Sequence, residues 1–442
     1  MMPAVAATPL PNVQYSLTQW LDYLMHLHAK PIDMGLARVS QVAHKLDIVS
    51  LKPQTHRLVI AGTNGKGSNV ALVSAIMQAA GYQVGCYTSP HLVRFNERSQ
   101  INGKSLSDAQ WIDAFVAVEK ARGAVSLSFF EFTTLAAIWF FHQQPLDLVI
   151  LEVGLGGRLD AVNAVDNTSC IITAIDLDHQ AFLGDNREAI GFEKAGVMRP
   201  HQLCVCSDPQ PPQSLLDHAQ QLEVSLRCLG QNYSYHRADA GWFFYSSSKE
   251  PSQAAGQVLE FLPLPALLGD FQLQNAAGVL AWLDAQTDFE VSCDAIKIGL
   301  EQVKHPGRLQ RLQLGQQDWL LDVAHNPQAA EQLAVWLQQD NAKHTTKPVA
   351  IFSALADKDI VGMINKVAPH VAQWILLDLR PEDRATDPVI MQQHLSDITT
   401  SQIADSAKQA IELAQAVAVD RVVVFGSFIT VGAIMTELEQ HG

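Results

Sequence analysis

Gly62-Thr63-Asn64-Gly65-Lys66-Gly67-Ser68 decides the fold, because it follows an apolar run at residues 58–61 and precedes a helical run at residues 69–80. A strand, a glycine-rich turn and a helix start place backbone N–H groups around a ligand, with the positive end of the helix dipole behind them. Lys66 adds a charge for the outer phosphates, and Ser68 adds a hydroxyl near a bound metal. We therefore expect the loop to hold nucleotide phosphates through Asn64, Gly65, Lys66, Gly67 and Ser68.

The spacing of this loop departs from that of the common P-loop. The pattern GxxxxGK[ST] needs a glycine where Ile60 stands, and a serine or threonine where Gly67 stands. A turn that only reverses the chain is the alternative interpretation. Because both the lysine and the hydroxyl are in place, we favour phosphate binding.

Length and composition bound the class of protein. A chain of 442 residues suggests about three domains at most, and large α/β domains make two the better expectation. The net charge is 30 − 45 = −15, so no basic face is expected to dominate, and we exclude a nucleic-acid partner. Binding of small anionic ligands is still compatible with this net charge, because it needs only a few local cations.

Several features favour a cytoplasmic protein. Residues 1–11 contain no lysine or arginine, so they do not form a signal peptide. The longest uncharged stretches, residues 132–146 and 422–436, fall short of the ~20 apolar residues of a membrane span. The six cysteines are scattered, as expected of reduced thiols. Cys204, Cys206 and His201 hint at zinc, but buried strand thiols are favoured because no fourth ligand is evident.

Apolar runs alternate with helical ones along the chain. The candidate strands are residues 58–61, 83–87, 148–152, 170–175 and 203–206. Continuous apolar strands flanked by helices predict a parallel sheet that is covered on both faces. Residues 231–257 are polar and are expected to form strands and loops with little core, and residues 271–285 are expected to form a helix.

A second alternation follows the break at His305-Pro306-Gly307-Arg308, where we place the domain boundary. The predicted strands are residues 319–323, 349–353, 374–379 and 421–426, and the predicted helices are residues 328–339 and 430–439. The predicted fold is α/β. A large P-loop-type N-terminal domain with a mostly parallel sheet spans residues 1–304, and a smaller Rossmann-like α/β domain spans residues 305–442.

Two residues outside the loop carry candidate chemistry. Glu152 ends a predicted strand, and ligands of open parallel sheets bind at the carboxyl ends of strands. A carboxylate there suits Mg²⁺, although it could instead cap a helix. Lys194 falls in the last turn of a helix predicted over residues 185–196, with Asp185 and Glu188 as a capping-box-like start and Gly196 as the stop.

Six further motifs occur in one order: TSPHLVRFNER (88–98), LEVGLGGRLD (151–160), LDH (177–179), FEKAG (192–196), PGR (306–308) and LDVAHNP (321–327). The loop GTNGKGS resembles the ATP-binding loop of the Mur ligase superfamily. The ordered set is similar to the bacterial folylpolyglutamate synthases that are also dihydrofolate synthases. The resemblance covers about residues 17–437, nearly the whole chain.

The resemblance implies a set of metal and catalytic residues. Its Mg²⁺ ligands correspond here to Ser89, Glu152 and His179. Its EKAG lysine, here Lys194, is carbamylated, and the resulting carboxylate holds a second Mg²⁺. Burial favours the neutral amine that this reaction needs. The catalytic residues implied are Lys66, Lys194 and His325.

The resemblance also implies the substrate sites. The pterin segments correspond to Ile32, Asp33, Met34, Ser128, Phe129, Phe130, Glu131, Leu159, Asp160 and Ala161. Without the resemblance, Phe129 and Phe130 would be interpreted as core. ATP contacts across the cleft correspond to Asn275, Arg308 and Asp322, and the incoming glutamate is assigned to His325 and Ser427. Gln272 and residues 353–355 depart from the usual motifs.

The expected activity is ATP-dependent amide ligation through an acyl phosphate. The implied substrates are dihydropteroate, folates, L-glutamate and ATP with Mg²⁺ at two sites, and the implied state is a cytoplasmic monomer without membrane or nucleic-acid partners. Two alternatives stay open: a cell-wall Mur ligase, which shares the loop, and a P-loop nucleotide switch, for which no Asn-Lys-x-Asp-like guanine motif is found in the sequence.

Overall fold

The computed structural model describes residues 13–50, 52, 54–246, 257–258, 261–380, 382, 384–396, 398–417 and 419–441. The expectations for residues 1–11, and for residues 247–256 of the polar segment, lie outside these ranges. Within them, no helix is both long enough and apolar enough to cross a membrane.

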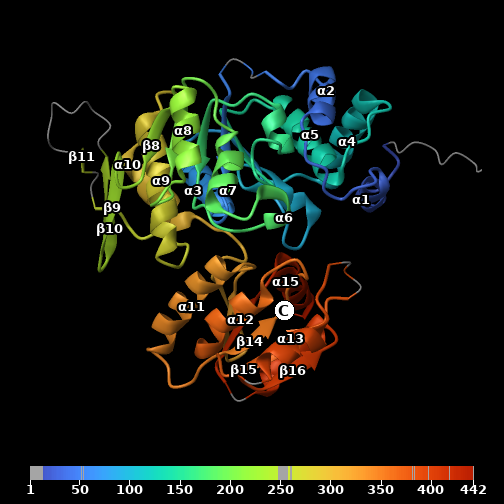
Figure 1. Ribbon diagram of the computed structural model, residues 1–442, viewed down its shortest axis with the longest axis vertical. Helices are drawn as coiled ribbons and strands as arrows, with labels where there is room; N and C mark the ends of the chain where they lie inside the picture. Colours follow the sequence, from blue (N-terminus) through green and yellow to red (C-terminus); the bar gives the residue numbers. More distant parts are fainter. Residues whose placement is uncertain are drawn as a thin grey trace, which may run out of the picture.

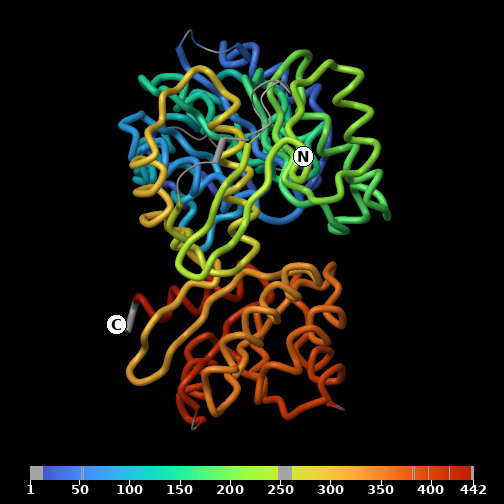
Figure 2. The backbone as a smooth tube through the Cα atoms, turned by 90° about the vertical axis from the view of Figure 1, so that its left-hand side faces the viewer, coloured from blue at the N-terminus to red at the C-terminus, as the bar shows by residue number. Residues whose placement is uncertain are grey.

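An eight-stranded sheet forms the larger, N-terminal lobe (Figures 1 and 2). Its strand order is β4-β3-β2-β5-β1-β6-β7-β8, and the six strands from β2 to β8 in that order run parallel. The strands are β1 (His56–Ala61), β2 (Val84–Tyr87), β3 (Ser99–Ile101), β4 (Lys104–Ser105), β5 (Leu148–Glu152), β6 (Ser169–Ile172), β7 (Leu203–Cys206) and β8 (Ser225–Cys228).

Helices cover both faces of this sheet because alternate residues of its strands are apolar on both sides. In β1, Val59 and Ala61 enter one core, and Leu58 and Ile60 enter the other. The helices of the lobe are α1 (Leu17–His26), α2 (Ala37–Lys45), α3 (Lys66–Ala79), α4 (Asp108–Arg122), α5 (Phe129–His142), α6 (Gln180–Leu183), α7 (Arg187–Ala195), α8 (Gln213–Gln221), α9 (Phe271–Ala285) and α10 (Cys293–Gln302), with short 3₁₀ turns η1 (Phe95–Arg98) and η2 (Ala161–Ala164).

A small antiparallel sheet follows in the chain, as expected for this segment, but the expectation of little core is wrong because Trp242 and Phe244 are fully buried in the core that contains α9. The sheet has the order β11-β10-β9, and it packs against α9. Its strands are β9 (Tyr233–Ala238), β10 (Gly241–Ser246) and β11 (Gln257–Val258).

The C-terminal lobe is built on a six-stranded sheet of order β12-β13-β17-β14-β15-β16. All neighbours are parallel except β12, which pairs antiparallel with β13. The strands are β12 (Gln310–Leu314), β13 (Gln317–Leu321), β14 (Val349–Phe352), β15 (Gln373–Leu377), β16 (Ser401–Ala404) and β17 (Arg421–Phe425). The helices are α11 (Pro327–Asn341), α12 (Ile360–Val367), α13 (Pro388–Leu395), α14 (Ala407–Ala416) and α15 (Phe428–His441), with the 3₁₀ turn η3 (Ala368–His370).

The predicted fold class is confirmed, and several local predictions need correction. Strand β13 ends at Leu321 rather than at residue 323, and β15 ends at Leu377 rather than at residue 379. Helix α3 begins at Lys66, three residues earlier than expected, so the end of the phosphate loop is its first turn. Strand β6 ends at Ile172 rather than at residue 175. Helix α7 begins at Arg187, and Asn186 caps it by accepting a hydrogen bond from Ala189 N, so the capping box of Asp185 and Glu188 is wrong.

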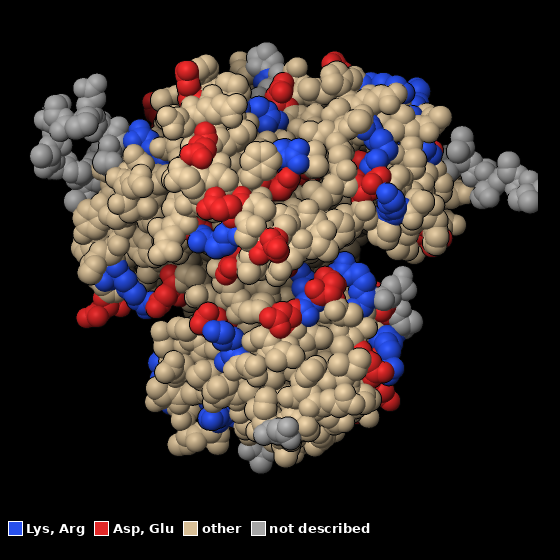
Figure 3. Space-filling view, in the orientation of Figure 1, with Lys and Arg blue, Asp and Glu red and all other residues tan. Residues whose placement is uncertain are grey.

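The two lobes face each other across a waist that is visible in the space-filling view (Figure 3). On this face, acidic and basic side chains are interspersed over both lobes, and several of each sign lie beside the waist. The functional residues are therefore to be sought where the sheet edges of the two lobes meet.

Helix α3, which carries the phosphate loop, is held from behind by a close approach of α10. A Cβ added at Gly299 would lie 2.5 Å from Ile76 Cα, a backbone atom that cannot move aside cheaply. We predict that Gly299→Ala lowers the free energy of unfolding by ~1–3 kcal/mol, although alanine is the better helix former. Urea denaturation measures this.

Ile298→Ala is the matched control, because Ile298 lies on the same helix with 42% of its surface exposed. Its effect should stay within about 0.5 kcal/mol. Equal stability of Gly299→Ala and the wild type would show that α3 and α10 are not tightly packed.

Candidate functional site

Three parallel strands bring the candidate residues to one edge of the first sheet. Strand β1 lies between β5 and β6, so the segments that follow the three strands meet at their carboxyl ends. There the phosphate loop, Glu152 and His179 line one small cavity of about 100 Å³, together with Ser89 and Lys194. We call this the Glu152 cavity. The strand order therefore assembles a group of residues that sequence spacing could only suggest.

The phosphate loop has the backbone that its glycines permit. Gly62 and Gly65 have φ values of 147° and 92°, which side chains rarely allow. Lys66 folds back over the loop and donates hydrogen bonds of 3.0 Å to the carbonyl oxygens of Gly62 and Thr63. Burial lowers the pKa of Lys66, and the negative charge of Glu152 opposes this shift. The Lys66 side chain is thus held against the loop by two carbonyl oxygens, and Glu152 is the main electrostatic influence that favours its charged form.

The three candidate metal ligands line the same cavity. Glu152 is 6% exposed, and its Oε2 accepts a hydrogen bond of 3.2 Å from Ser89 N. Burial raises the pKa of Glu152 and lowers that of His179 to about 4, so the imidazole is neutral at pH 7 and free to act as a ligand. A carboxylate and a hydroxyl are donors that suit Mg²⁺, so the residues present fit this ion.

Ser68 lies apart from this group. Its Oγ accepts a hydrogen bond of 3.3 Å from Gln272 Nε2 and lies 3.5 Å from His305 Nδ1. It lines a different cavity from Glu152. The structure therefore gives Ser68 neighbours on the nucleotide side of the loop rather than beside the candidate metal ligands.

Lys194 is buried without an ion pair among the described residues. Its side chain is 3% exposed, and Nζ donates a hydrogen bond of 2.8 Å to the carbonyl oxygen of Gly62. The neighbouring Glu193 pairs with Arg158 at 2.7 Å instead. Burial lowers the pKa of Lys194 well below its ordinary value, and the charge of Lys66 adds to the shift. Both effects favour the neutral form of the Lys194 amine over the charged form.

A cavity of about 430 Å³ opens on one side of the loop, and we call it the Asn275 cavity. The loop residues Asn64, Gly65 and Ser68 form one wall. The C-terminal lobe contributes Arg308 and Asp322, whose carboxylate accepts backbone hydrogen bonds from Leu309 and Ala324. All three residues predicted to contact ATP, Asn275, Arg308 and Asp322, therefore line the same cavity as the loop.

Gln272 had no assignable role in the sequence, and here it orders the Asn275 cavity. Its side chain is 1% exposed and accepts a hydrogen bond of 2.9 Å from Asn275 Nδ2. Asn275 Oδ1 in turn accepts one of 3.1 Å from Asn69 of α3. The chain of amides ties α9 to α3, so it fixes the Asn275 side chain relative to the loop.

A third cavity, of about 350 Å³, contains all the residues assigned to the pterin, and we call it the Phe129 cavity. It is lined by Ile32, Asp33, Met34, Ser128, Phe129, Phe130, Glu131, Leu159, Asp160 and Ala161, among others. The aromatic rings lie at its wall, partly exposed. The predicted grouping of three distant segments is therefore present in the structure.

The three carboxylates of this cavity already have protein partners. Glu131 accepts from Ser128 N in the capping box of α5, and also from Arg38. Asp160 caps η2 and accepts from Leu155 N and Val162 N, and burial raises its pKa to about 6. Asp33 pairs with Arg38 at 2.7 Å. Each of these three acids therefore also has a structural role, which is independent of any ligand in the cavity.

Arg98 is a residue of this cavity that the sequence did not single out. Its guanidinium lies 5.5 Å from the centroids of the Phe95 and Phe129 rings, and its Nε donates a hydrogen bond of 3.0 Å to His91. The side chain is 8% exposed, and among the described residues it forms no ion pair. A buried cation without a carboxylate partner favours an anionic ligand in the cavity.

A fourth cavity of about 880 Å³ lies between the lobes, and we call it the Ser427 cavity. His325 lines it from the C-terminal lobe, and His179 lines it from the N-terminal lobe. Ser427, assigned to glutamate from the resemblance, is 3% exposed, and its hydroxyl is within 2.7 Å of the Thr430 hydroxyl. The Ser427 side chain therefore has a structural role at the start of α15, where it bonds to Thr430.

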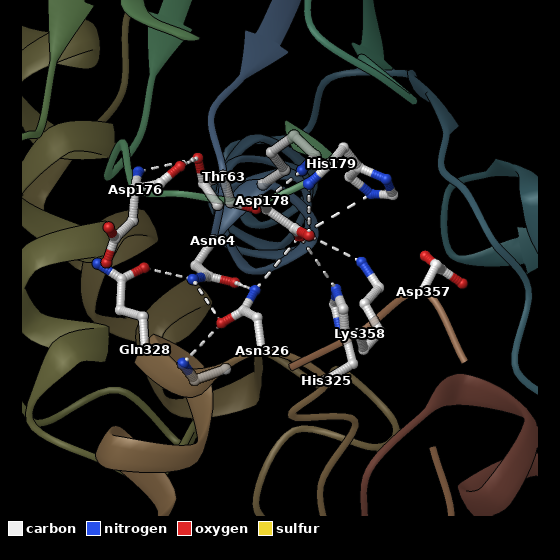
Figure 4. A network of polar contacts seen from close by, with 12 residues as sticks. Thr63, Asn64, Asp176, Asp178, His179, His325, Asn326, Gln328, Asp357 and Lys358 are labelled. Atoms are coloured by element: carbon white, nitrogen blue, oxygen red, sulfur yellow. Dashed lines mark hydrogen bonds and ion pairs between the residues drawn. The ribbon is translucent and has the colours of Figure 1, made fainter. Parts of the chain in front are cut away.

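Asp178 is the centre of a network that joins the two lobes (Figure 4). It accepts hydrogen bonds from Lys358 Nζ at 2.7 Å and from Asn326 Nδ2 at 3.4 Å, and His325 Nε2 lies 3.7 Å away. Burial acts to raise the pKa of Asp178, but the neighbouring His325, His179 and Lys358 together hold it below the ordinary value. Sequence reasoning missed this role, although the acid stands next to His179.

Asn64 extends the network into the phosphate loop. Its side chain exchanges hydrogen bonds with Asn326 and Gln328 of the C-terminal lobe (Figure 4). The Thr63 hydroxyl in the same loop donates a hydrogen bond to Asp176 O and accepts one from Asp176 N. The position of the C-terminal lobe is thereby coupled to the loop that is expected to hold phosphates.

The zinc hint has no geometric support. Cys204 and Cys206 are buried free thiols, and His201 lies at the surface beside Glu223. Over the described ranges, no group of three or more His, Cys, Asp or Glu side chains is placed to hold a metal ion. Ser89, the serine among the candidate Mg²⁺ ligands, is not one of these residue types.

Comparison with known proteins identifies the family. A family profile described as "Mur ligase, glutamate ligase domain" matches residues 307–428. A glutamate ligase domain that faces a glycine-rich phosphate loop places the chain among the ligases. The dihydrofolate synthase/folylpolyglutamate synthase of Escherichia coli (strain K12) is 40% identical over 431 residues, which are 97% of each chain.

Two solved structures share the whole fold. E. coli FolC in complex with DHPP and ADP is 39% identical with a TM-score of 0.89, covering 98% of this chain and 99% of its own. The bifunctional folylpolyglutamate synthase/dihydrofolate synthase of Yersinia pestis, complexed with AMPPNP and Mn ion, is 39% identical with a TM-score of 0.87, covering 97% and 99%. The chain therefore belongs to the dihydrofolate synthase/folylpolyglutamate synthase family.

This result confirms the resemblance seen in the motifs. It also favours that family over the two alternatives, the cell-wall Mur ligase and the nucleotide switch, because the relatives are similar along nearly their whole length.

The pair of Asp178 and Lys358 supplies a prediction about the contact between the lobes. Their side chains are only 11% and 6% exposed, so removing one partner leaves the other charge buried. We predict that Asp178→Asn and Lys358→Met each lower the free energy of unfolding by ~2 kcal/mol. The double variant should lose less than the sum by ~0.5 kcal/mol or more. A denaturation cycle measures the coupling.

The exposed pair of Lys366 and Glu331, at 2.9 Å with 45% and 53% exposure, is the control for this cycle. Its coupling should be within ~0.5 kcal/mol of zero. Strict additivity of the Asp178 and Lys358 variants would mean that the network does not hold the lobes together.

Proposed function

We propose that this protein joins L-glutamate to dihydropteroate, giving dihydrofolate, and to the γ-carboxylate of folates, with ATP as the energy source. The observation that carries the proposal is the sharing of walls between cavities. The Glu152 cavity shares Asn64 and Arg308 with the Asn275 cavity. It shares Ser89 and His179 with the Phe129 cavity, and it shares His325 with the Ser427 cavity. Three substrates can therefore meet at one point.

The first step is activation of the acceptor. ATP fits the Asn275 cavity with its phosphates on the loop, where Lys66 and the N–H groups at the start of α3 stabilise charge on the transferring phosphoryl group. An oxygen of the acceptor carboxylate attacks the γ-phosphorus, and ADP leaves. The product is an acyl phosphate, which makes phosphate a leaving group in place of hydroxide.

The second step is amide formation. The glutamate amine attacks the acyl carbon, phosphate leaves, and the amine gives up a proton. We assign the incoming glutamate to the Ser427 cavity, with His325 at the wall that it shares with the Glu152 cavity. The narrow Glu152 cavity between the lobes limits access of water, which would otherwise hydrolyse the acyl phosphate.

A divalent cation at Ser89, Glu152 and His179 would supply electrostatic stabilisation of the transferring phosphoryl oxygens. Support comes from the chemistry of the donors, from their place in one cavity, and from the relative that carries AMPPNP and Mn ion. A second Mg²⁺ is proposed beside a carbamylated Lys194. The buried, unpaired amine at 2.8 Å from Gly62 O is the observation that favours this modification.

The acceptor is assigned to the Phe129 cavity, because a flat heterocycle can stack on Phe129 or Phe130. The relative from E. coli was solved in complex with DHPP and ADP, so a protein of this family holds a second small molecule together with the nucleotide. We further propose that residues 1–304 and 305–442 act as two units of one cytoplasmic monomer, joined at the Asp178 network.

Product formation tests the proposal. With ATP and glutamate, the purified protein should form dihydrofolate from dihydropteroate and a γ-diglutamate from a folate with one glutamate, as followed by liquid chromatography with mass detection. Lys66→Ala should reduce both rates by ~10³-fold, because it removes the charge that meets the transferring phosphoryl group.

Lys104→Ala is the matched control, because Lys104 is exposed on the edge strand β4. It should leave both rates unchanged. If folates are extended while dihydropteroate is untouched, the dihydrofolate synthase activity is refuted and folate extension stands. Near-normal turnover by Lys66→Ala would refute the role of the loop.

Lys194 supplies a separate prediction. In ¹³C-bicarbonate, the wild type should show a carbamate carbon resonance that is absent from Lys194→Ala. Lys194→Ala should lose most of its activity, and Lys194→Glu should recover part of it by restoring a carboxylate. A fully active wild type without the resonance, or a resonance that persists in Lys194→Ala, would rule out carbamylation at this position.

A further inference from the structure

One cation of the C-terminal lobe lies at the wall of the acceptor site. Arg384 lines both the Phe129 cavity and the Ser427 cavity. Of the described residues that line the Phe129 cavity, it is the one contributed by the C-terminal lobe. His325 and Ser427 line the Ser427 cavity but do not reach the Phe129 cavity. Arg384 thus stands where the acceptor site opens toward the other lobe.

The backbone that carries Arg384 is well anchored. The Arg384 carbonyl accepts a hydrogen bond of 2.9 Å from Ala356 N, and Thr386 N donates one of 3.1 Å to Ala354 O. Leu355 and Ala385 form an isolated antiparallel bridge between these bonds. Thr386 is 4% exposed. The side chain therefore projects toward the two cavities from a fixed base.

The guanidinium is only loosely held by the protein. Arg384 Nη2 lies 3.2 Å from Asp357 Oδ1, with the two side chains 53% and 46% exposed. Figure 4 shows Asp357 at the margin of the network, directed away from Lys358. An exposed pair of this kind contributes little free energy, so a substrate carboxylate can replace Asp357 at small cost.

The two acceptors of the proposed reaction differ in what they offer to such a cation. Dihydropteroate carries one carboxylate, and that group reacts with ATP. A folate ends in glutamate, so beside the reacting γ-carboxylate it carries an α-carboxylate that stays ionised through the reaction. A cation at the mouth of the acceptor cavity, away from the phosphate loop, has an anionic partner only in the second case.

We propose that Arg384 binds the non-reacting α-carboxylate of a glutamylated acceptor, and that it thereby favours folates over dihydropteroate. The inference rests on the proposed function, because it assumes that both acceptors use the Phe129 cavity. Arginine can present two N–H groups to a carboxylate, which gives orientation as well as affinity. The residue is a specificity determinant and takes no part in the bonds that form or break.

The test compares Arg384→Gln with the wild type for each substrate in turn. KM for a reduced folate with one glutamate should rise ~10-fold, while KM for dihydropteroate and KM for glutamate stay unchanged. Arg384→Lys should recover part of the loss because it keeps the charge. Arg380→Gln is the matched control, because Arg380 is equally exposed, pairs with Asp378 and Asp387, and is absent from the walls of both cavities.

Two results would overturn the inference. A rise in KM for glutamate with both acceptors would place Arg384 in the site of the incoming amino acid. Equal changes for the two acceptors, or none, would remove its role in discrimination. The same comparison made by calorimetric binding of each acceptor in the absence of glutamate needs no turnover. It therefore separates failure of this inference from failure of the proposed ligase activity.

Discussion

Parallel pairing of β1 with β5 on one side and β6 on the other is the constraint on which the site depends. Parallel strands end at the same edge, so their following segments must share one small volume. The phosphate loop, Glu152 and the segment that carries Asp178 and His179 are brought together in this way. Helices α3, α9 and α10 then hold the loop from one face of the sheet.

A second feature of the structure is that several ionisable side chains at the cavities are buried without an ion-pair partner among the described residues. Lys66, Lys194, Arg98 and Glu152 all lie at the cavities, and none of them forms an ion pair with another described residue. Such burial is costly unless a ligand supplies the missing charge. These groups therefore favour charged ligands in the cavities, whereas Asp178 and Lys358 form a buried ion pair that joins the two lobes.

Much of the fold was predictable, because apolar periodicity is a local signal. Strands β5 and β7 and helix α9 have the predicted bounds. The errors lie where contacts distant in the sequence decide the local structure, as at the end of β6, where Thr173 N still donates to Ala61 O and Ala174 O accepts from Thr63 N of the phosphate loop. Side chains add to this pairing, because the Thr173 hydroxyl donates to Asn64 O at 2.7 Å and Asp208 accepts from Ile175 N. Likewise Glu188 accepts from Gln213 N and Ser214 N of a distant segment instead of capping its own helix.

The sequence by itself determined the phosphate loop, because a strand, a turn and a helix start are adjacent in the chain, and it determined the class of ligand that fits there. Tertiary structure alone decided the partners of that loop. Asp178 and Lys358 are 180 residues apart, and Asn64 and Asn326 are 262 apart. Arg98 and Arg384 could be recognised as candidate ligand-binding residues only from the cavities that they line. Contacts of this kind depend on how two separately formed sheets dock, and no local pattern of residues encodes that geometry.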